Sequence, residues 1–378
     1  MKILLLFLIG GTGIWAQVRI PGPGGPSSVS GGGGGGGGDQ HEYRVTLAGS
    51  GQIPASQSNF SVLVCANMTL GNGGACPTAT GLKTTANGGY VTNSSGYDIV
   101  FSSTACSSPT LMKWEMVTYT GSSGAMEAWV LNPSLAASGV FYVCVGDPAI
   151  TTFQGGAVGS EWDTYTQGVW HLPNGATLSA GDSSGHGNNG ANGGGPGFAA
   201  SSGQFDGGIY NSGGSPNPVI ALPANMLSSN VATWTLWLNY SSSMDAYQTL
   251  ASVFTSNADS MDILFNGMSP NLLGGNYSNA AVSGTVSSGT WHHVALTSNG
   301  SITQFYIDGV ASGSTGTTNF TTFSATGGIG NRNGSSYSLF GYEDEVHLYS
   351  TNRSANWIAT EYNNQSAPAS FMTVAEVY

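Results

Sequence analysis

The sequence predicts an all-β protein in which an N-terminal β-sandwich domain precedes a second β-sandwich that ends in a short C-terminal helix. Three observations favour this fold class. Only 7% of the residues are charged, whereas a soluble domain usually carries about 25%. Glycine accounts for 59 of the 378 residues, yet aromatic residues reach 10%, which argues against disorder. Short apolar stretches alternate with turn residues along most of the chain, as is typical of strands.

The N-terminus has the layout of a signal peptide. Lys2 precedes an apolar stretch, Ile3–Ile9, and small or uncharged residues follow it up to Ala16. We therefore expect a leader over residues 1–16 and a secreted, extracellular protein; the alternative is a buried N-terminal strand. The apolar stretch is too short to span a bilayer and no later segment is long enough, so no membrane insertion is expected.

Residues 17–40 are rich in proline and glycine and include eight consecutive glycines, Gly31–Gly38. They show no sustained Gly-X-Y period, which excludes a collagen helix. This segment is predicted to be a flexible linker.

Residues 41–157 are predicted to form the N-terminal β domain. Six strand candidates separated by turn residues suit a sandwich. They are Tyr43–Leu47, Asn59–Cys65, Tyr97–Phe101, Leu111–Tyr119, Met126–Leu131 and Val140–Val145.

The four cysteines, Cys65, Cys76, Cys106 and Cys144, all lie in this domain. An even number of cysteines in an exported domain predicts two disulfides and leaves three connectivities open. Cys65 and Cys76 flank a glycine-rich loop and are the pair whose closure costs the least chain entropy.

The second domain is predicted to cover residues 162–378. Asp308-Gly309 is a strong two-residue hairpin signal, and Ser354 can cap a helix from Ala355 to about Tyr362. The remainder is expected to be loops rich in Gly, Ser and Asn. The strands expected here are Gly168–Leu172, Trp234–Asn239, Trp291–Thr297, Gln304–Ile307 and Glu343–Tyr349.

Three segments of this second half resemble the laminin-G-like, concanavalin-type jelly roll. They are Asp182-Ser-Ser-Gly-His-Gly-Asn-Asn-Gly190, Gly289–Thr297 and Phe340–Tyr349, with Tyr306–Val310 at the expected spacing between the last two. The resemblance implies a concanavalin-like sandwich in a secreted or surface module, and it implies no particular ligand.

The first half resembles the bacterial domain of unknown function 2341, which often precedes such a jelly roll. The similar segments are Asn59–Val64, Gly96–Phe101, Trp129–Pro133 and Gly168–Leu172. The stretch from Cys65 to Cys76 departs from that pattern and is interpreted as an insertion stapled by a disulfide.

A calcium site is expected where the loop from Asp182 meets the late acidic strand. In related jelly rolls these two segments meet around a cation, so the resemblance implies Asp182, Asn188 and Asp344 as ligands. Calcium takes six to eight oxygens from carboxylates and carbonyls, and the glycines of the loop would let its carbonyls turn inward. The alternative is that Asp182 forms an Asx-turn and Asp344 is a charge at the rim.

A glycoside hydrolase is a less favoured hypothesis. Glu343 and Glu345 would share a face of one strand, as a catalytic pair requires, but position 347 is a histidine and the other acids are isolated. His292 and His293 should point to opposite faces, so they are not expected to share a metal ion. His171 and His347 have no partner at metal-ligand spacing.

The composition also limits the partners. Seven basic residues in a chain of net charge −12 form no cluster, which argues against nucleic acid and anionic membranes. Trp234 and Trp237 alternate, so an outward one could stack on a sugar, although packing in the core is the favoured role for either tryptophan. The resulting hypothesis is a secreted, non-catalytic, calcium-dependent module that binds a carbohydrate or an extracellular polymer in adhesion. The alternative is a structural or assembly subunit of an extracellular complex.

Overall fold

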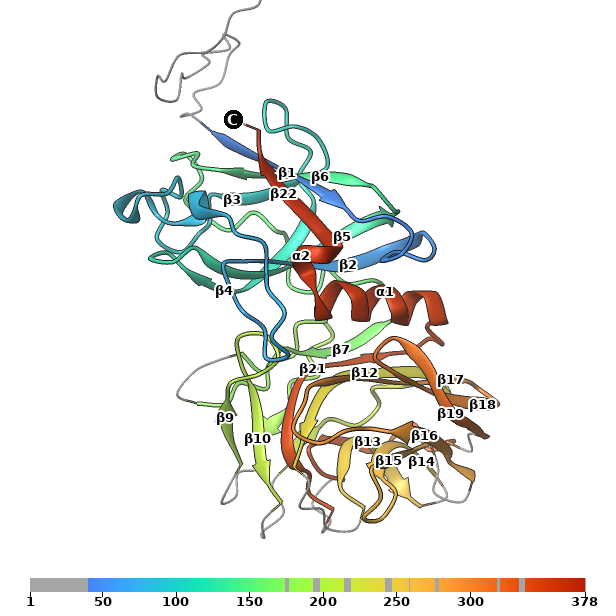
Figure 1. Cartoon of the computed structure of the whole chain (residues 1–378). Helices are drawn as coiled ribbons and strands as arrows, with labels where there is room; N and C mark the ends of the chain where they lie inside the picture. Colours follow the sequence, from blue (N-terminus) through green and yellow to red (C-terminus); the bar gives the residue numbers. More distant parts are fainter. Residues whose placement is uncertain are drawn as a thin grey trace, which may run out of the picture.

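The computed structural model describes residues 40–377 except 174–176, 193–197, 214–218, 242–246, 258, 276–278, 318–319 and 333–336. The predicted leader and nearly all of the predicted linker lie outside the described residues. Figure 1 shows two β lobes, with a helix at the waist between them. The all-β prediction is confirmed. Among the described residues, no helix has the length and apolar character needed to cross a membrane.

The first lobe is a sandwich of two antiparallel sheets, with strand orders β22-β1-β6-β3 and β2-β5-β4. Each of the six predicted strands is present near its predicted position. Their facing sides bury a core that includes Phe60, Phe101, Trp114 and Phe141. The strands are β1 (His41–Leu47), β2 (Gln57–Ala66), β3 (Ile99–Ser102), β4 (Lys113–Thr120), β5 (Ala125–Leu135) and β6 (Val140–Val145).

The end of the chain returns to this first lobe. Helix α1 (Ala355–Ser366) lies at the waist, and α2 (Pro368–Phe371) leads into β22 (Met372–Glu376). Strand β22 pairs antiparallel with β1, with Val374 opposite Val45. The predicted boundary between the two domains, at residues 157–162, remains a prediction. This boundary assigns the residues of β22 to the second domain, but they lie in the first lobe.

The second lobe is a jelly roll made of one long sheet folded on itself, in the order β8-β11-β20-β13-β14-β15-β16-β19-β18-β17-β12-β21-β10-β9. Strand β7 pairs with β21 beside this path. Trp234, Leu236 and Leu238 share the inner face of β12, in the core between the two halves. The strands that position the sites below are β7 (Thr166–Trp170), β12 (Val231–Tyr240), β13 (Thr249–Ser256), β14 (Asp259–Phe265), β17 (His292–Asn299), β20 (Thr326–Ile329) and β21 (Phe340–Tyr349).

The expectation of loops elsewhere in this half is wrong. Residues rich in Gly, Ser and Asn form strands here because sheet pairing and burial decide strand formation more than intrinsic preference does. The unexpected strands besides β13, β14, β20 and β22 are β8 (Ala191–Asn192), β9 (Phe198–Ser201), β10 (Gly208–Ser212), β11 (Ile220–Leu222), β15 (Asn271–Gly275), β16 (Ala281–Thr285) and most of β19 (Val310–Thr317).

Two local predictions are confirmed in detail. Asp308 and Gly309 both have positive φ, 51° and 77°, and connect β18 (Ile302–Ile307) to β19. This conformation is the one that a tight hairpin requires. Ser354 caps α1 by accepting a hydrogen bond from the backbone N–H of Trp357 at 3.2 Å.

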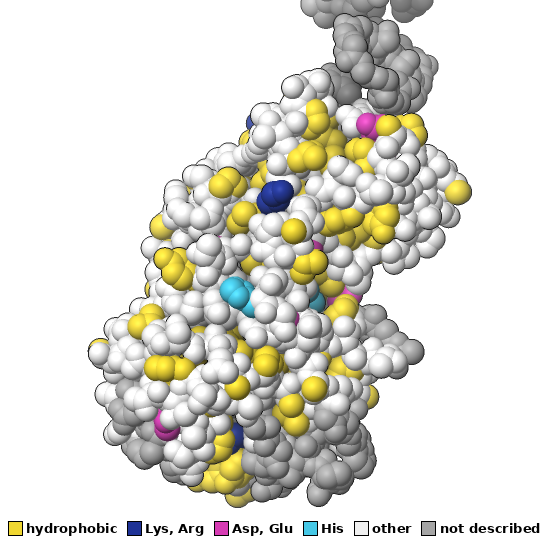
Figure 2. Space-filling view, turned by 180° about the vertical axis from the view of Figure 1, so that it is seen from behind, with side chains coloured by type: hydrophobic (Ala, Val, Ile, Leu, Met, Phe, Trp, Pro, Cys, Tyr) yellow, Lys and Arg dark blue, Asp and Glu magenta, His cyan; other side chains and the backbone are white. Residues whose placement is uncertain are grey.

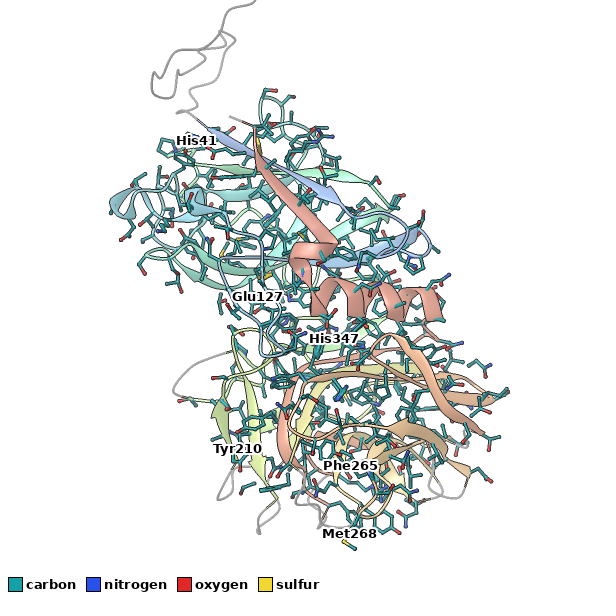
Figure 3. All side chains as sticks on the ribbon, viewed as in Figure 1. His41, Glu127, Tyr210, Phe265, Met268 and His347 are labelled. Atoms are coloured by element: carbon teal, nitrogen blue, oxygen red, sulfur yellow. A yellow bond between two sulfur atoms is a disulfide. The ribbon has the colours of Figure 1, made fainter. Side chains whose placement is uncertain are left out.

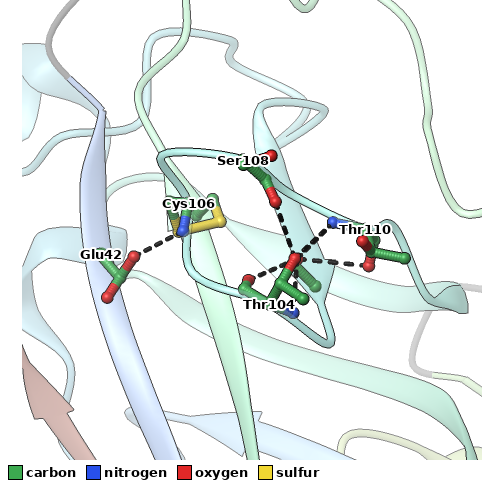
Figure 4. The surroundings of a disulfide bond; sticks show 7 residues. Glu42, Thr104, Cys106, Ser108 and Thr110 are labelled. Carbon is green, nitrogen blue, oxygen red and sulfur yellow. Dashed lines mark hydrogen bonds between the residues drawn. A yellow bond between two sulfur atoms is a disulfide. The ribbon is translucent and has the colours of Figure 1, made fainter.

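The four cysteines form two disulfides, Cys65–Cys76 and Cys106–Cys144, and none is free. The first staples a loop that reaches the second lobe, where the Gly71 N–H donates to the Gln204 carbonyl at 2.7 Å. Figure 4 shows the second disulfide, where the Cys106 N–H donates to the Glu42 carboxylate at 2.6 Å.

Candidate functional site

The loop that begins at Asp182 is held by hydrogen bonds to that carboxylate. Oδ1 of Asp182 accepts from the N–H groups of Val169 and Ser184, at 3.0 and 2.9 Å. Oδ2 accepts from the Ser184 hydroxyl and the Asn188 N–H, at 2.8 and 2.7 Å. These four donors match the four acceptor positions of a carboxylate, and the bonds to Ser184 form an Asx-turn.

Asp344 lies in β21, fully buried on the side that faces the first lobe. Its Oδ2 accepts from the Phe205 N–H at 3.0 Å, and Oδ1 accepts from the N–H of Glu345 at 2.8 Å. Burial, together with the nearby charges of Glu345 and Asp206, raises the pKa of Asp344 well above its usual value. No hydrogen bond within the described part of the chain joins Asp182 to Asp344, so the shared calcium site stays a prediction.

Glu343 and Glu345 do not share a face, which corrects the prediction from strand alternation. Strand β21 opposes β12 with Glu343 beside Leu238, but the register shifts between Thr235 and Trp237. Such a bulge places an extra residue in one strand and changes the direction of its side chains. Glu343 therefore lies beside the inner core, whereas Glu345 faces the first lobe, and the two cannot act as a carboxylate pair.

Both tryptophans of β12 are buried, so neither forms an outward platform for a sugar. Trp234 lies in the inner core, and Trp237, on the other face of β12, is 1% exposed and donates to Gln365 at 2.6 Å. Its face of the strand is covered by α1 and the first lobe, which the sequence pattern of one strand could not reveal. His292 and His293 have separate partners, as expected: His292 contacts Asp308 at 2.7 Å, and His293 faces α1.

An aromatic and polar hollow lies on the outer face of β13 and β14. Its volume is about 170 Å³, and it is lined by Tyr247, Asn257, Leu264, Arg332 and Tyr337. We call it the outer-face hollow. Neighbouring residues of β14, Met261 and Ile263, point into the inner core, so alternation directs Leu264 to the opposite face. Figures 1 and 3 place β14 and the labelled Phe265 in the part of the jelly roll remote from the first lobe.

Arg332 organises the polar side of the outer-face hollow. Its guanidinium donates to Asn257 at 2.7 Å and to the buried carboxylate of Asp262 at 2.5 Å. The guanidinium carbon lies 4.2 Å from the ring centre of Phe254 and 5.5 Å from that of Tyr337. Charge pairing and ring contacts together fix the guanidinium in one position.

Several buried polar atoms around this arginine have no hydrogen-bond partner among the described residues: Asp262 Oδ1, Arg332 Nε, Ser252 Oγ and Thr249 Oγ1. Ser252 stands directly opposite Asp262 in the paired strands, and Thr249 stands opposite Leu264. Buried polar atoms normally have partners. Burial also raises the pKa of Asp262 to about 7, although Arg332 opposes the shift. Of these four residues Arg332 lines the hollow, and the other three are buried beside it.

Charged side chains are sparse on the molecular surface. Figure 2 shows only scattered acidic and basic side chains on the face that it presents, and no basic cluster. This view agrees with the seven Lys and Arg residues in the whole sequence. A nucleic-acid partner would need such a cluster.

One family model matches part of the second lobe. Residues 212–359 match the family described as the Concanavalin A-like lectin/glucanases superfamily. This match agrees with the predicted jelly roll, while the resemblance of the first half to the domain of unknown function 2341 stays a prediction. None of the curated proteins compared with the chain matches it.

Solved structures with similar folds include domain 4 of AbnA, a GH43 extracellular arabinanase from Geobacillus stearothermophilus, in complex with arabinotriose. It is 20% identical, with a TM-score of 0.42, over 53% of this chain and 98% of that domain. The binding domain of Paraclostridial Mosquitocidal Protein 1 is 13% identical, with a TM-score of 0.41, and the match covers 52% of both chains. The binding domain of botulinum neurotoxin serotype D is 14% identical, with a TM-score of 0.40, over 53% of this chain. The chain covers about half the length of these two toxin domains, 52% of each.

Proposed function

We propose that this protein is a secreted, non-catalytic binding module that holds a glycan or another polyhydroxylated polymer in the outer-face hollow. One observation carries the proposal: Asp262 Oδ1 and Arg332 Nε are buried beside the hollow lined by Tyr247 and Tyr337, and neither atom has a hydrogen-bond partner in the described part of the chain. A sugar presents hydroxyl groups that donate and accept hydrogen bonds and an apolar face that packs on aromatic rings. A few fixed polar groups among apolar walls are typical of ligand sites.

Secretion is supported by the two disulfides, because disulfides persist in oxidising compartments. The absence of catalysis is supported by β21, since its two glutamates lie on opposite faces. Adhesion to a polymer would then depend on recognition by the hollow and not on a reaction.

A glycan array of neutral polysaccharides, followed by titration of the strongest binder, tests the proposal. Tyr337→Ala should weaken binding by about fivefold or more, since an aromatic contact contributes about 1 kcal/mol. Tyr165→Ala is the matched control, because Tyr165 is 51% exposed and lies by Arg353 at the waist. The proposal is rejected if no glycan binds, or if Tyr337→Ala binds as tightly as the unchanged protein.

Calcium dependence is a separate part of this proposal. It is supported by Asp344, a fully buried carboxyl near Glu345 and Asp206, because a divalent cation stabilises clustered carboxylates. The Asp182 carboxylate already accepts four hydrogen bonds. To bind a calcium ion together with Asp344, it would have to give up one of these hydrogen bonds. Calcium bound only to the folded state would add about 2.7 kcal/mol at a concentration one hundredfold above its Kd.

Thermal melting with and without a chelator tests the calcium proposal. After a chelator has stripped the protein of metal, CaCl2 alone should raise the Tm of the second lobe, and Asp344→Asn should remove this response to calcium. Asp308→Asn is the control, because Asn-Gly suits the same hairpin. If calcium does not shift the melting curve of the stripped, unchanged protein, Asp182 is a turn residue only.

A further inference from the structure

A second cluster of functional groups lies at the waist, remote from the outer-face hollow. His171, Glu345 and His347 are each at most 4% exposed, and one ligand atom from each lies within 4.8 Å of the others. His171 Nδ1 is 2.8 Å from Glu345 Oε1, and His347 Nε2 is 3.0 Å from Glu345 Oε2. Figure 3 shows the labelled His347 between the lobes, below Glu127 of the first lobe.

The bulge in β21 creates this convergence. A regular strand would alternate Asp344 and Glu345 between faces, but the bulge turns both toward the first lobe together with His347. Glu345 has a φ of +48°, which is rare for a residue with a side chain. His171 follows the end of β7, and β7 pairs with β21 so that Val169 stands opposite His347. His171 and Glu345, 174 residues apart in the sequence, are therefore in direct contact.

The other ring nitrogen of each histidine also has a fixed partner. His171 Nε2 is 2.8 Å from Glu115 Oε1, and Glu115 belongs to β4 of the first lobe. His347 Nδ1 is 3.0 Å from the Tyr349 hydroxyl and 3.5 Å from Glu361 of α1. Histidines that bind metals almost always use their second nitrogen in this way, which fixes the tautomer and the direction of the ring.

Aromatic rings enclose the cluster. The Trp129 ring centre lies 5.8 Å from that of His171 and 5.5 Å from that of His347. The Trp162 ring lies 6.0 and 5.3 Å from the same two imidazoles. Trp162 also donates to Glu115 at 3.1 Å. An apolar wall of this kind strengthens charge interactions inside it.

We propose that His171 Nδ1, the Glu345 carboxylate and His347 Nε2 bind a zinc ion that fastens the two lobes together. Tetrahedral zinc with nitrogen and oxygen ligands at about 2.1 Å holds those atoms about 3.4 Å apart, so the present spacings need modest adjustment. Calcium is disfavoured because it takes mainly oxygen ligands. Water completes the coordination; Glu127 is also buried near this cluster, but it is not among the side chains whose ligand atoms all lie within 4.8 Å of one another.

The alternative is that protons alone hold the cluster, with an imidazolium at position 171 between Glu115 and Glu345. The zinc-bound cluster and the proton-held cluster use the same side chains in nearly the same positions. They can therefore be distinguished by metal content and not by shape. Zinc binding would release protons from the histidines, whereas the proton-held cluster needs no metal ion.

The test measures metal directly on the full chain. The protein is refolded with ZnCl2 or CoCl2, passed over a desalting column and analysed by elemental mass spectrometry and visible absorption. We expect one equivalent of metal per chain, and with cobalt the visible bands of a tetrahedral ion. His171→Gln and His347→Gln should both lose the metal. His292→Gln, a histidine bonded to Asp308 on the surface hairpin, is the matched control and should keep it.

A positioning variant keeps the test decisive if the ligand variants fail to fold. Glu115→Gln leaves all three ligands in place but weakens the hold on His171, and should lower zinc affinity about 10- to 100-fold. Substoichiometric metal in the refolded unchanged protein would overturn the proposal, and so would equal zinc affinity in the unchanged protein and Glu115→Gln. Either result would leave a proton-held cluster.

Discussion

At the scale of residues, two glutamates of one strand show how environment decides chemistry. Burial alone raises the pKa of Glu343 well above its usual value, and neither of its carboxyl oxygens has a hydrogen-bond partner among the described residues. Burial also acts on Glu345, but the charges and hydrogen bonds of His171 and His347 outweigh it and lower its pKa to about 2. Glu343 is therefore a neutral acid in the core of the jelly roll, whereas Glu345 is an anion in a polar cluster.

The sequence could not distinguish these two glutamates. Strand alternation predicts that the side chains of residues 343 and 345 share a face. The bulge that separates them depends on how β21 pairs with β12, and no local sequence pattern reveals this pairing. The same limit applies to His171 and His347, since their contact depends on strand pairing between distant segments. By contrast, the Asp308-Gly309 turn and the Ser354 cap were predictable, because their determinants lie within a few residues.

At the scale of elements, the first lobe depends on the last strand of the chain. Strand β22 covers the edge of β1, and its first residue, Met372, and the preceding Phe371 are 1% and 0% exposed in the core of this lobe. Strand patterns predicted the six earlier strands of the lobe. They did not predict β22, because five residues at a chain end carry little pattern and their partner lies more than 300 residues away.

Truncation tests this dependence. A chain that ends at Ser370 loses β22 and two buried side chains, and its free energy of unfolding should fall by about 3 kcal/mol or more. A chain that ends at Glu376 loses only the last two residues and is the control. Denaturant unfolding followed by tryptophan fluorescence measures the difference. Equal midpoints for the two truncated chains would show that the first lobe folds without its last strand.

At the scale of the whole molecule, the two lobes share one buried interior. Trp129 of β5, Trp162 of the connecting segment and Trp237 of the jelly roll belong to one hydrophobic cluster. The loop stapled by Cys65–Cys76 adds polar contacts, since the Asn72 N–H donates to Gln204 Oε1 at 2.9 Å. We infer that the lobes unfold as coupled units, so a group in either lobe affects the stability of both.

Two buried carboxyls, one at the waist and one in the jelly roll, predict how stability depends on pH. Burial raises the pKa of Glu161 to about 7, with help from the charge of Glu115, and burial raises that of Asp262 to about 7 despite Arg332. Their ordinary values are 4.5 and 3.8. Between these limits the folded state holds protons that the unfolded state has released, so stability falls as pH rises. The net charge of −12 adds repulsion in the same direction.

We therefore expect the Tm to be highest near pH 5 and to fall as the pH rises to 7. Each carboxyl contributes a slope of at most about 1.4 kcal/mol per pH unit. Asp262→Asn cannot release a proton, so it should flatten this decline, and Glu161→Gln should flatten it further. Glu376→Gln, at an exposed position 43% accessible to solvent, should leave the slope unchanged.

Calorimetry across this pH range measures the slopes. A Tm that rises toward pH 7, or equal slopes in Asp262→Asn and the unchanged protein, would mean that these carboxyls are ionised in the folded state and that their burial is offset by a bound cation or by water.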